Sequence, residues 1–322
     1  MASGRIRKAG KWVLGVLLVL LLGFFYGFVP WFLTSIATSG RFHYPDANDG
    51  KTPQSFGVAF SAVEFRSSDG ILLKGWYIPA TPPAGEKPKG TIIYCHGLNR
   101  TRVEMLPDAV FAHSVGYNGL LLDLRHQGQS EGAISTVGYQ ERLDAEAAVR
   151  FALDQEKAER PMILWGVSMG AAAALLAAAE SPDVSAVISD STFLSFTDTV
   201  QHHYYLFRNF ARRRLWWFPP LPGFPVIDEV IYLVARKGHF RPEDFDIEKA
   251  VMRINPRPIL FVGVQGDQRM PPSIAQKLYE EATSPQKGIV ILPGNRHGEG
   301  FTQATEQYEK AVTGFLAGLK EN

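Results

Sequence analysis

The chain has 322 residues, of which 46% are hydrophobic and 20% are charged, and its formal net charge is +1. This composition excludes a disordered chain, and the near-zero net charge gives no electrostatic basis for a nucleic-acid partner. The single cysteine, Cys95, excludes an internal disulfide framework and a cysteine-rich metal site.

The first predicted element is an apolar segment at residues 12–33, which contains no charged side chain. As a helix it would be about 33 Å long, enough to cross a hydrocarbon core of roughly 30 Å. Trp12 and Trp31 lie near its two ends, where interfacial aromatic side chains are typical. We therefore expect one transmembrane helix at residues 12–33, which remains attached to the mature protein as an anchor.

Flanking charges predict the orientation of this helix. The charged residues before it are all basic and those after it are of both signs: Arg5, Arg7, Lys8 and Lys11 before, and Arg41, Asp46, Asp49 and Lys51 after. The positive-inside rule then places the short N-terminus, residues 1–11, in the cytoplasm and the remaining domain on the other side of the membrane.

Two other interpretations of the apolar segment stay open. Residues 35–37, Ser-Ile-Ala, form a weak cleavage site for a signal peptide, and cleavage would give a secreted protein. A signal core is about 7–15 residues long, shorter than this segment, which favours the anchor. A buried core helix is disfavoured because the segment has no polar face.

The rest of the chain is predicted to be a linker, residues 34–56, and one globular domain, residues 57–322. The predicted strands are 58–65, 72–78, 91–95, 117–124, 162–167, 184–188, 258–264 and 288–292, and the predicted helices are 102–115, 139–153, an alanine-rich segment after Ser168, 273–281 and 301–319. Strands that alternate with helices of this length predict an α/β fold, here a mainly parallel eight-stranded sheet covered by helices on both faces.

The alternation stops at residues 193–255, and a connection of about 60 residues inside a compact domain is usually functional. The insert is rich in aromatic and basic side chains: Tyr204, Tyr205, Phe207, Arg208, Phe210, Arg212, Arg213, Arg214, Trp216, Trp217 and Phe218. We interpret it as a helical lid whose Arg and Trp side chains lie at the headgroup level of the membrane. The alternative is a helical extension with a solvated arginine face.

The most informative motif is Gly-Val-Ser-Met-Gly at residues 166–170, where an apolar run meets the alanine-rich segment. Gly166 and Gly170 permit a strained turn that lifts the Ser168 hydroxyl clear of the sheet. The amide of Met169 then starts a helix, where it can stabilise a developing negative charge. A chain of this length contains G-x-S-x-G by chance about one time in ten, so the strand before it and the helix after it carry the interpretation.

A serine nucleophile needs a base and a group that orients the base. Asp267 follows the predicted strand 258–264, and His297 follows the last predicted strand, 288–292. Because loops at the carboxyl ends of parallel strands meet at one edge of the sheet, we expect Asp267 and His297 to lie near Ser168.

Other residues compete for these two roles. Asp190 follows the strand after the motif and is an alternative acid, although an Asp-Ser-Thr turn more often caps a strand. Glu299 is close enough in sequence to contact His297, but a solvent-facing position is favoured. The other candidate bases do not follow a later strand and are expected in loops or at the surface: His126, His202, His203 and His239.

The developing oxyanion needs two donors. The amide of Met169 is one, and the loop after strand 91–95 should provide the second, for which the amide of Leu98 is the candidate. Gly97 allows the backbone of this loop to approach the substrate. The same His96-Gly97 pair could equally form a plain turn.

Together these pieces resemble the α/β-hydrolase superfamily, in particular its single-domain serine esterase/lipase-like and prolyl-oligopeptidase-like branches. The matching residues are 95–97 (CHG), 123–130 (DLRHQGQS), 166–170 (GVSMG), 266–267 (GD) and 296–297 (RH). The chain order Ser168, Asp267, His297 is typical of the superfamily. One departure is His126, which stands where relatives usually have the first glycine of D-x-R-G-x-G-x-S.

The resemblance implies a serine hydrolase that works through an acyl-enzyme, without a metal or organic cofactor, but it does not name a substrate. The aromatic insert and the anchor favour a carboxylic ester, acyl or lipid-like. One alternative is a peptidase or amidase with the same three residues. Another is a membrane-tethered binding protein that kept the fold without catalysis. The sequence leaves the natural substrate and the oligomeric state open.

Overall fold

The computed structural model of the chain describes residues 2–40, 42–216 and 223–319, with side chains from residue 9 onward. Arg41, Trp217 and Phe218 lie outside the described residues, as do the side chains of Arg5, Arg7 and Lys8.

An eight-stranded sheet forms the centre of the domain, in the order β1-β2-β4-β3-β5-β6-β7-β8. Its strands are β1 (Ser61–Arg66), β2 (Leu72–Ile78), β3 (Thr91–Cys95), β4 (Asn118–Asp123), β5 (Met162–Val167), β6 (Ala186–Asp190), β7 (Ile259–Val264) and β8 (Lys287–Leu292). Only β2 pairs antiparallel with its neighbours, and the other pairings are parallel. Continuous apolar runs such as β3, β5 and β7 are buried along their whole length, as expected for strands covered on both faces.

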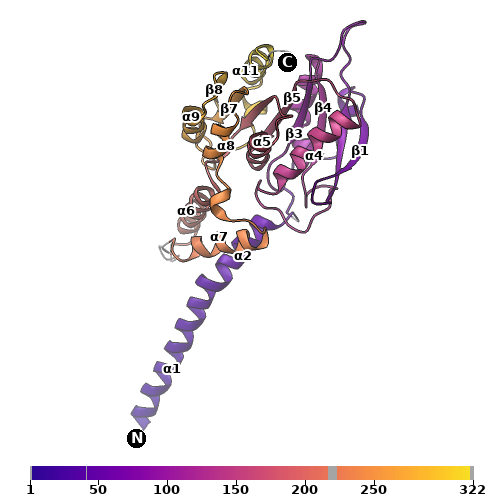
Figure 1. Cartoon of the computed structure of the whole chain (residues 1–322). Coiled ribbons are helices and arrows are strands. Elements are labelled where there is room, and N and C mark those ends of the chain that lie inside the picture. Colours follow the sequence, from indigo (N-terminus) through magenta and orange to yellow (C-terminus); the bar gives the residue numbers. More distant parts are fainter. Residues whose placement is uncertain (1, 41, 217–222, 320–322) are drawn as a thin grey trace.

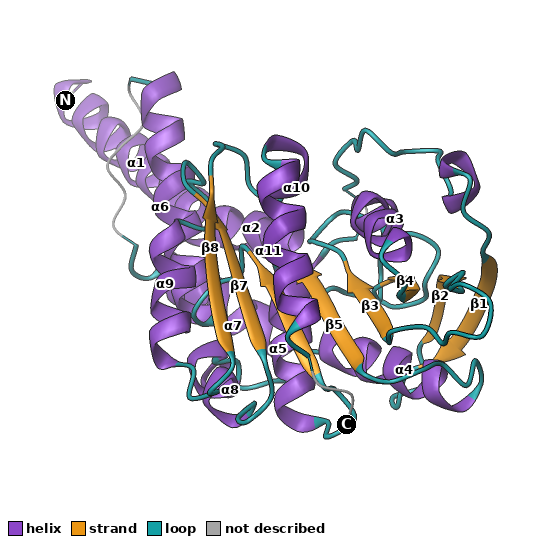
Figure 2. Cartoon of the chain, turned by 90° about the horizontal axis from the view of Figure 1, so that it is seen from above, coloured by secondary structure: helices purple, strands orange, loops and turns teal. Residues whose placement is uncertain are grey.

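Helices cover both faces of this sheet, as Figure 2 shows. On one face lie α3 (Leu106–Ser114) and α11 (Thr305–Ala317), and on the other lie α4 (Glu141–Asp154), α5 (Met169–Glu180), α8 (Ile247–Arg253) and α9 (Pro272–Glu281). A short α10 (Gly300–Gln303) precedes α11. Helix α5 packs against the sheet, α4 and α8, and small alanine side chains allow this close contact. The predicted fold class is therefore confirmed: the chain has the α/β-hydrolase fold.

The predicted insert, residues 193–255, divides into two parts. Helices α6 (Phe196–Arg214) and α7 (Val226–Lys237) pack on each other below the sheet in Figure 1. Helix α8 instead packs against α5 and α9, and Phe245, Ile247 and Val251, in and just before it, are fully buried in the main core. The segment that departs from the standard alternation is therefore shorter than predicted and ends before α8.

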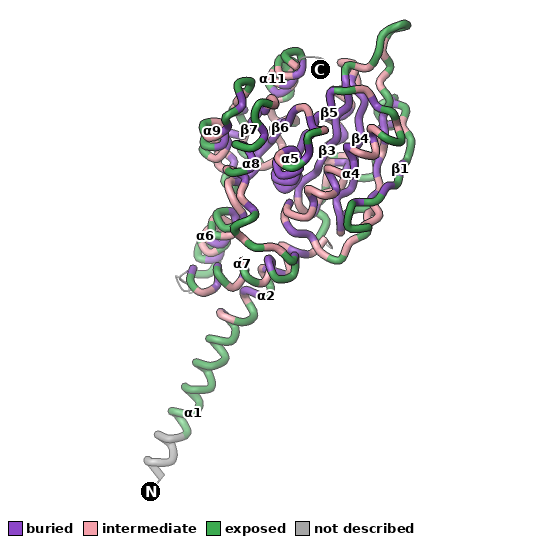
Figure 3. The backbone as a smooth tube through the Cα atoms, viewed as in Figure 1, coloured by how far each residue is buried: buried purple, intermediate pink, exposed green. Residues whose placement is uncertain are grey.

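At the N-terminus, α1 (Ala2–Gly23), a π-helical turn (Phe24–Phe28) and α2 (Val29–Thr38) form one rod that projects from the domain (Figure 1). The wide turn precedes Pro30, whose ring would clash with the carbonyl of the preceding turn in a regular α-helix. Residues Ala9–Thr38 are long and apolar enough to cross a membrane. The helix ends at Thr38 instead of the predicted residue 33, because α2 packs against α7. Exposure in Figure 3 changes accordingly, from an exposed α1 to a partly buried α2.

Candidate active site

A strained turn connects β5 to α5 and carries Ser168. Its backbone has φ 54° and ψ −116°, outside the regions that most side chains adopt. A Cβ on Gly166 would lie 2.3 Å from the carbonyl oxygen of Gly170, and one on Gly170 would lie 2.0 Å from the carbonyl oxygen of Cys95. Only glycine fits at both positions, so the turn can bring α5 directly against β3. The Ser168 amide donates to the carbonyl oxygen of Asp190 at 2.8 Å, which fixes the turn.

Loops after β7 and β8 bring Asp267 and His297 to the serine. The His297 Nε2 atom lies 2.8 Å from Ser168 Oγ, and its Nδ1 atom lies 2.7 Å from Asp267 Oδ2. Strands β5, β6, β7 and β8 are mutually parallel, so their carboxyl ends share one edge of the sheet. The three residues that the sequence singled out therefore form one hydrogen-bonded chain.

Asp267 is held in place by its backbone surroundings. Its Oδ1 atom accepts hydrogen bonds from the amides of Arg269 (2.8 Å) and Met270 (3.0 Å). Burial raises the pKa of Asp267, but the hydrogen bond from His297 and those from the two amides outweigh burial, and the net pKa lies below the usual value. The carboxylate is thus ionised at neutral pH and faces the imidazole.

The rival acids and bases lie elsewhere. Buried Asp190 accepts hydrogen bonds from Tyr308 (2.8 Å) and Ser191 (2.7 Å), and Glu299 Oε2 accepts from Arg296 (3.1 Å). Three histidines hydrogen-bond to backbone carbonyl oxygens: His126 to Gly132 at 2.9 Å, His202 to Gln268 at 2.8 Å and His203 to Thr199 at 2.8 Å. His239 is exposed. Among the described residues, His297 is the histidine that hydrogen-bonds to Ser168.

Two amides at the turn are available to an oxyanion. In the described part of the chain, the amides of Leu98 and Met169 donate to no other protein group. Gly97, which precedes Leu98, lies next to the serine, since a Cβ on it would be 3.7 Å from Ser168 Cβ. Both amides are therefore free to act as the pair of donors that the sequence predicts.

Two side chains, the buried His96 and the partly buried Glu104, contact the peptide at Gly97. His96 Nδ1 donates to Gly97 O (2.8 Å), while its Nε2 accepts from the Leu124 amide (3.0 Å). Glu104 Oε2 accepts from the Gly97 amide at 2.6 Å. The sequence left His96-Gly97 open as a plain turn and gave no signal for Glu104, which is seven residues away and belongs to no motif.

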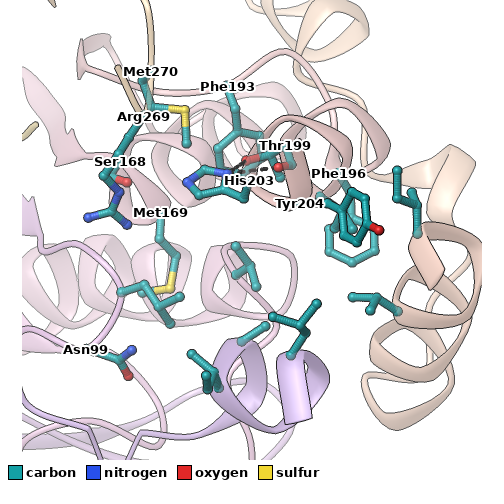
Figure 4. Close-up of a pocket in the computed structure, with 18 of the residues that line it drawn as sticks. Asn99, Ser168, Met169, Phe193, Phe196, Thr199, His203, Tyr204, Arg269 and Met270 are labelled. Carbon is teal, nitrogen blue, oxygen red and sulfur yellow. Dashed lines mark hydrogen bonds between the residues drawn. The ribbon is translucent and has the colours of Figure 1, made fainter. Parts of the chain in front are cut away.

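A cavity of about 250 Å³ opens beside Ser168. Its lining is mostly apolar: Leu33, Ile36 and Ala37 in α2; Tyr44, Leu98, Asn99 and Val137; Phe193, Phe196, Thr199, Val200, His203 and Tyr204 in and before α6; Ile227 and Val230 in α7; and Ser168, Met169, Arg269 and Met270. Figure 4 shows Ser168 and Met169 on one side of it and Phe196 and Tyr204 on the other. The α6–α7 segment therefore roofs the serine, in agreement with the predicted position of a lid.

His203 is a half-buried titratable group in the lining of this cavity. Burial lowers its pKa to about 4, so the imidazole is neutral at pH 7. Its Nδ1–H donates to Thr199 O, and the second ring nitrogen is therefore a hydrogen-bond acceptor (Figure 4).

The segment after the N-terminal helix, which includes Ser39, Phe42 and Tyr44, is bound to the domain and does not form a free linker. The side-chain amide of Asn99 is oriented so that both its oxygen and its nitrogen find suitable partners. In this orientation the nitrogen donates to the carbonyl oxygens of Ser39 (2.7 Å) and Phe42 (3.1 Å). The Tyr44 amide donates to Asn99 O (3.0 Å). Asn99 follows Leu98, so this exit segment contacts the loop that offers the oxyanion donor. The predicted linker, residues 34–56, therefore begins in a helix, and its following part, here called the strap, is hydrogen-bonded to the domain.

His126 also meets this strap. It has φ 61°, the left-handed conformation that suits the glycine usual at this position in relatives. Its carbonyl oxygen lies so close to Gly40 that a Cβ there would be 1.6 Å from it. His126 therefore adopts the backbone conformation that glycine has in relatives, and the loop conformation is unchanged.

Comparison with known proteins agrees with this geometry. The sequence model of the family described as "Serine aminopeptidase, S33" matches residues 86–226. The structure is similar to the Pyrococcus furiosus esterase Pf2001, with a TM-score of 0.67 and 22% identity, over 86% of this chain and 97% of that one. The chain therefore has the α/β-hydrolase fold, and residues 86–226 are similar to this family.

Two relatives of this α/β-hydrolase extend the similarity beyond the matched region. The uncharacterized protein YqkD of Bacillus subtilis is 27% identical over 264 residues, 81% of each chain. The uncharacterized membrane protein YNL320W of Saccharomyces cerevisiae is 24% identical and covers 88% of this chain and 93% of its own. Both alignments span most of the hydrolase domain.

Proposed function

We propose that the protein is a serine hydrolase that cleaves carboxylic esters through an acyl-enzyme. The observation that carries the proposal is the hydrogen-bonded chain Asp267–His297–Ser168, which ends beside an apolar cavity. A weak hydroxyl nucleophile gains reactivity when a neighbouring base removes its proton during attack.

Each step of the reaction has a protein group. His297 Nε2 accepts the Ser168 proton as Oγ attacks the ester carbonyl, and Asp267 stabilises the imidazolium that results. The amides of Leu98 and Met169 bind the oxyanion of the tetrahedral intermediate. His297 then protonates the departing alcohol, and a water activated by the same imidazole hydrolyses the acyl-enzyme. The proposed reaction steps use no metal or organic cofactor.

The lining of the cavity favours an ester with an apolar acyl group. A peptidase is the second candidate, because the matching family model is described as a serine aminopeptidase. An aminopeptidase requires a negative group to bind the free amine of its substrate. Among the described residues that line the cavity there is no acidic side chain, and Arg269 is cationic. This charge distribution supports the ester over the amine-bearing peptide.

We further propose that the N-terminal helix is retained as the membrane anchor, with residues 1–11 in the cytoplasm and the hydrolase domain on the other side. Cleavage after Ala37 would remove Leu33, Ile36 and Ala37 from the wall of the cavity. A site that needs these residues argues for an uncleaved helix. Secretion after cleavage is the alternative, and the N-terminal sequence of the mature protein distinguishes the two.

The deciding experiment compares the full-length protein with Ser168→Ala and Asp267→Asn. The wild type should react with a fluorophosphonate probe and hydrolyse p-nitrophenyl esters, and Ser168→Ala should lose both. Asp267→Asn should reduce kcat by about 10⁴-fold, because the imidazole then loses its orienting carboxylate. The matched control is Asp190→Asn, which changes a buried carboxyl that does not contact His297. A folded wild type that neither reacts nor turns over would support the binding-protein alternative.

A further inference from the structure

The helix that precedes the domain takes part in the cavity beside Ser168. Leu33, Ile36 and Ala37 line the cavity, and all three belong to α2. The apolar helix Ala9–Thr38 has 30 residues, and is therefore about 45 Å long. A hydrocarbon core of roughly 30 Å accommodates about two thirds of it. Its last turns therefore reach the membrane surface at the point where they line the cavity.

This end of the helix is packed firmly against the α6–α7 segment. Tyr26, Val29 and Leu33 contact a small buried cluster that contains Tyr204 and Ile227. The contact between α2 and α7 is among the larger helix–helix contacts in the described chain. The helix and the roof of the cavity therefore form one unit, and the helix does not act as a loose tether.

The tip of the α6–α7 segment presents large apolar side chains to its surroundings. Trp216, Phe224 and Phe210 are 93%, 75% and 60% exposed. Three arginines, residues 212–214, precede Trp216 in the sequence. Figures 1 and 3 place α6 and α7 beside the end of the membrane helix. Exposed aromatic and arginine side chains at this level are typical of a surface that contacts lipid headgroups and acyl chains.

We propose that the substrate is an ester dissolved in the same bilayer that holds the helix, and that its acyl chain binds along Leu33, Ile36 and Ala37. This inference rests on the proposed ester hydrolysis and adds the substrate class and the route. A cavity of about 250 Å³ lies at the small end of ligand sites, which fits one acyl chain. The membrane helix is then both the anchor and part of the specificity pocket.

The test uses the full-length protein in phospholipid nanodiscs with p-nitrophenyl acetate and p-nitrophenyl decanoate. Ala37→Phe places a ring in the cavity, and should lower the decanoate-to-acetate ratio of kcat/KM by about tenfold or more. Ala37→Val should give a smaller change in the same direction. The matched control is Ala9→Phe, the same substitution at an exposed position of the same helix. It should leave the ratio unchanged.

The outcomes separate this inference from the proposed function. The proposed function is contradicted if the wild type does not hydrolyse p-nitrophenyl acetate, or if Ser168→Ala still hydrolyses it. Equal ratios for wild type, Ala37→Val and Ala9→Phe, with acetate turnover intact, overturn the acyl site on α2 and leave the function standing. If Ala37→Phe fails to fold, Ala37→Val decides.

A second variant tests the route from the bilayer. Trp216→Ser combined with Phe224→Ser should raise the KM for decanoate several-fold in nanodiscs and leave acetate unaffected, because both positions lie outside the cavity. An unchanged KM for decanoate would show that the ester does not reach the site across this surface.

Discussion

At the scale of single residues, the least expected feature is the support of the Gly97 peptide by two titratable groups, the buried His96 and the partly buried Glu104. Neutral His96 uses both ring nitrogens for backbone contacts, and burial is the main cause of its lowered pKa. Glu104 lies between the Gly97 amide and the Arg100 guanidinium, whose Nε atom is 3.3 Å from Glu104 Oε1. Both side chains position the Leu98 amide and take no part in the bond changes.

Glu104 should make stability depend on pH in a defined direction. Burial raises its pKa from 4.5 to about 7, and the Gly97 amide and Arg100 offset burial only in part. Between pH 4.5 and 7 Glu104 is ionised in the unfolded chain but still protonated in the folded one. The stabilisation of the folded state that Glu104 provides is therefore complete below pH 4.5 and is lost as the pH rises towards 7. Glu104→Gln removes this titration. Relative to wild type, the variant should gain up to about 3 kcal/mol between pH 4.5 and 8, measured by unfolding at several pH values. A difference that does not change with pH would contradict the raised pKa.

At the scale of elements, the turn between β5 and α5 depends strictly on glycine. Gly170→Ala would force the new Cβ against the backbone of β3, where no side chain can move aside. We expect a loss of at least about 3 kcal/mol of unfolding free energy, or about 6–12 °C in Tm. Gly314→Ala is the matched control, since Gly314 lies in α11 with open space around its Cα. That substitution should be neutral or stabilising. A Gly170→Ala variant as stable as Gly314→Ala would show that the helix can shift away from the strand.

The sequence was sufficient for most elements and for the positions of Ser168, Asp267 and His297. Parallel strands bring their carboxyl ends to one edge, so a residue that follows a strand is placed without any knowledge of packing. Contacts distant in sequence could not be predicted in this way. Glu104 reaches Gly97 because the chain folds back after β3, and α2 continues to Thr38 because α7 covers it. The catalytic roles of the three residues remain a prediction.

The boundaries of the insert show the same limit. Residues 193–255 look uniform as an interruption of the strand–helix pattern, yet α8 packs against α5 and α9, whereas α6 and α7 pack against each other. Local composition cannot distinguish a short buried helix from part of a lid, because both are apolar on one side. Contacts with α5 and α9 make the distinction.

At the scale of the whole molecule, the orientation across the membrane can be tested with cysteine labelling. Cys95 is fully buried, and burial raises the pKa of its thiol well above the usual value, so it should not react with maleimides. In intact cells, a membrane-impermeant maleimide should label Glu306→Cys, at an exposed position of α11, and should not label Ser3→Cys. After permeabilisation both should react. The reverse pattern would place the hydrolase domain in the cytoplasm.

The segment that joins the N-terminal helix to the domain also restricts how the domain can move relative to that helix. Thr38 accepts a hydrogen bond from the Ser135 amide at 3.0 Å, and the next residues are bound to Asn99 and packed against His126. If the N-terminal helix is the membrane anchor proposed above, these contacts hold Ser168 at a fixed height above the bilayer. Diffusion of the substrate within the membrane plane, and not in the surrounding water, would then set how often the two meet.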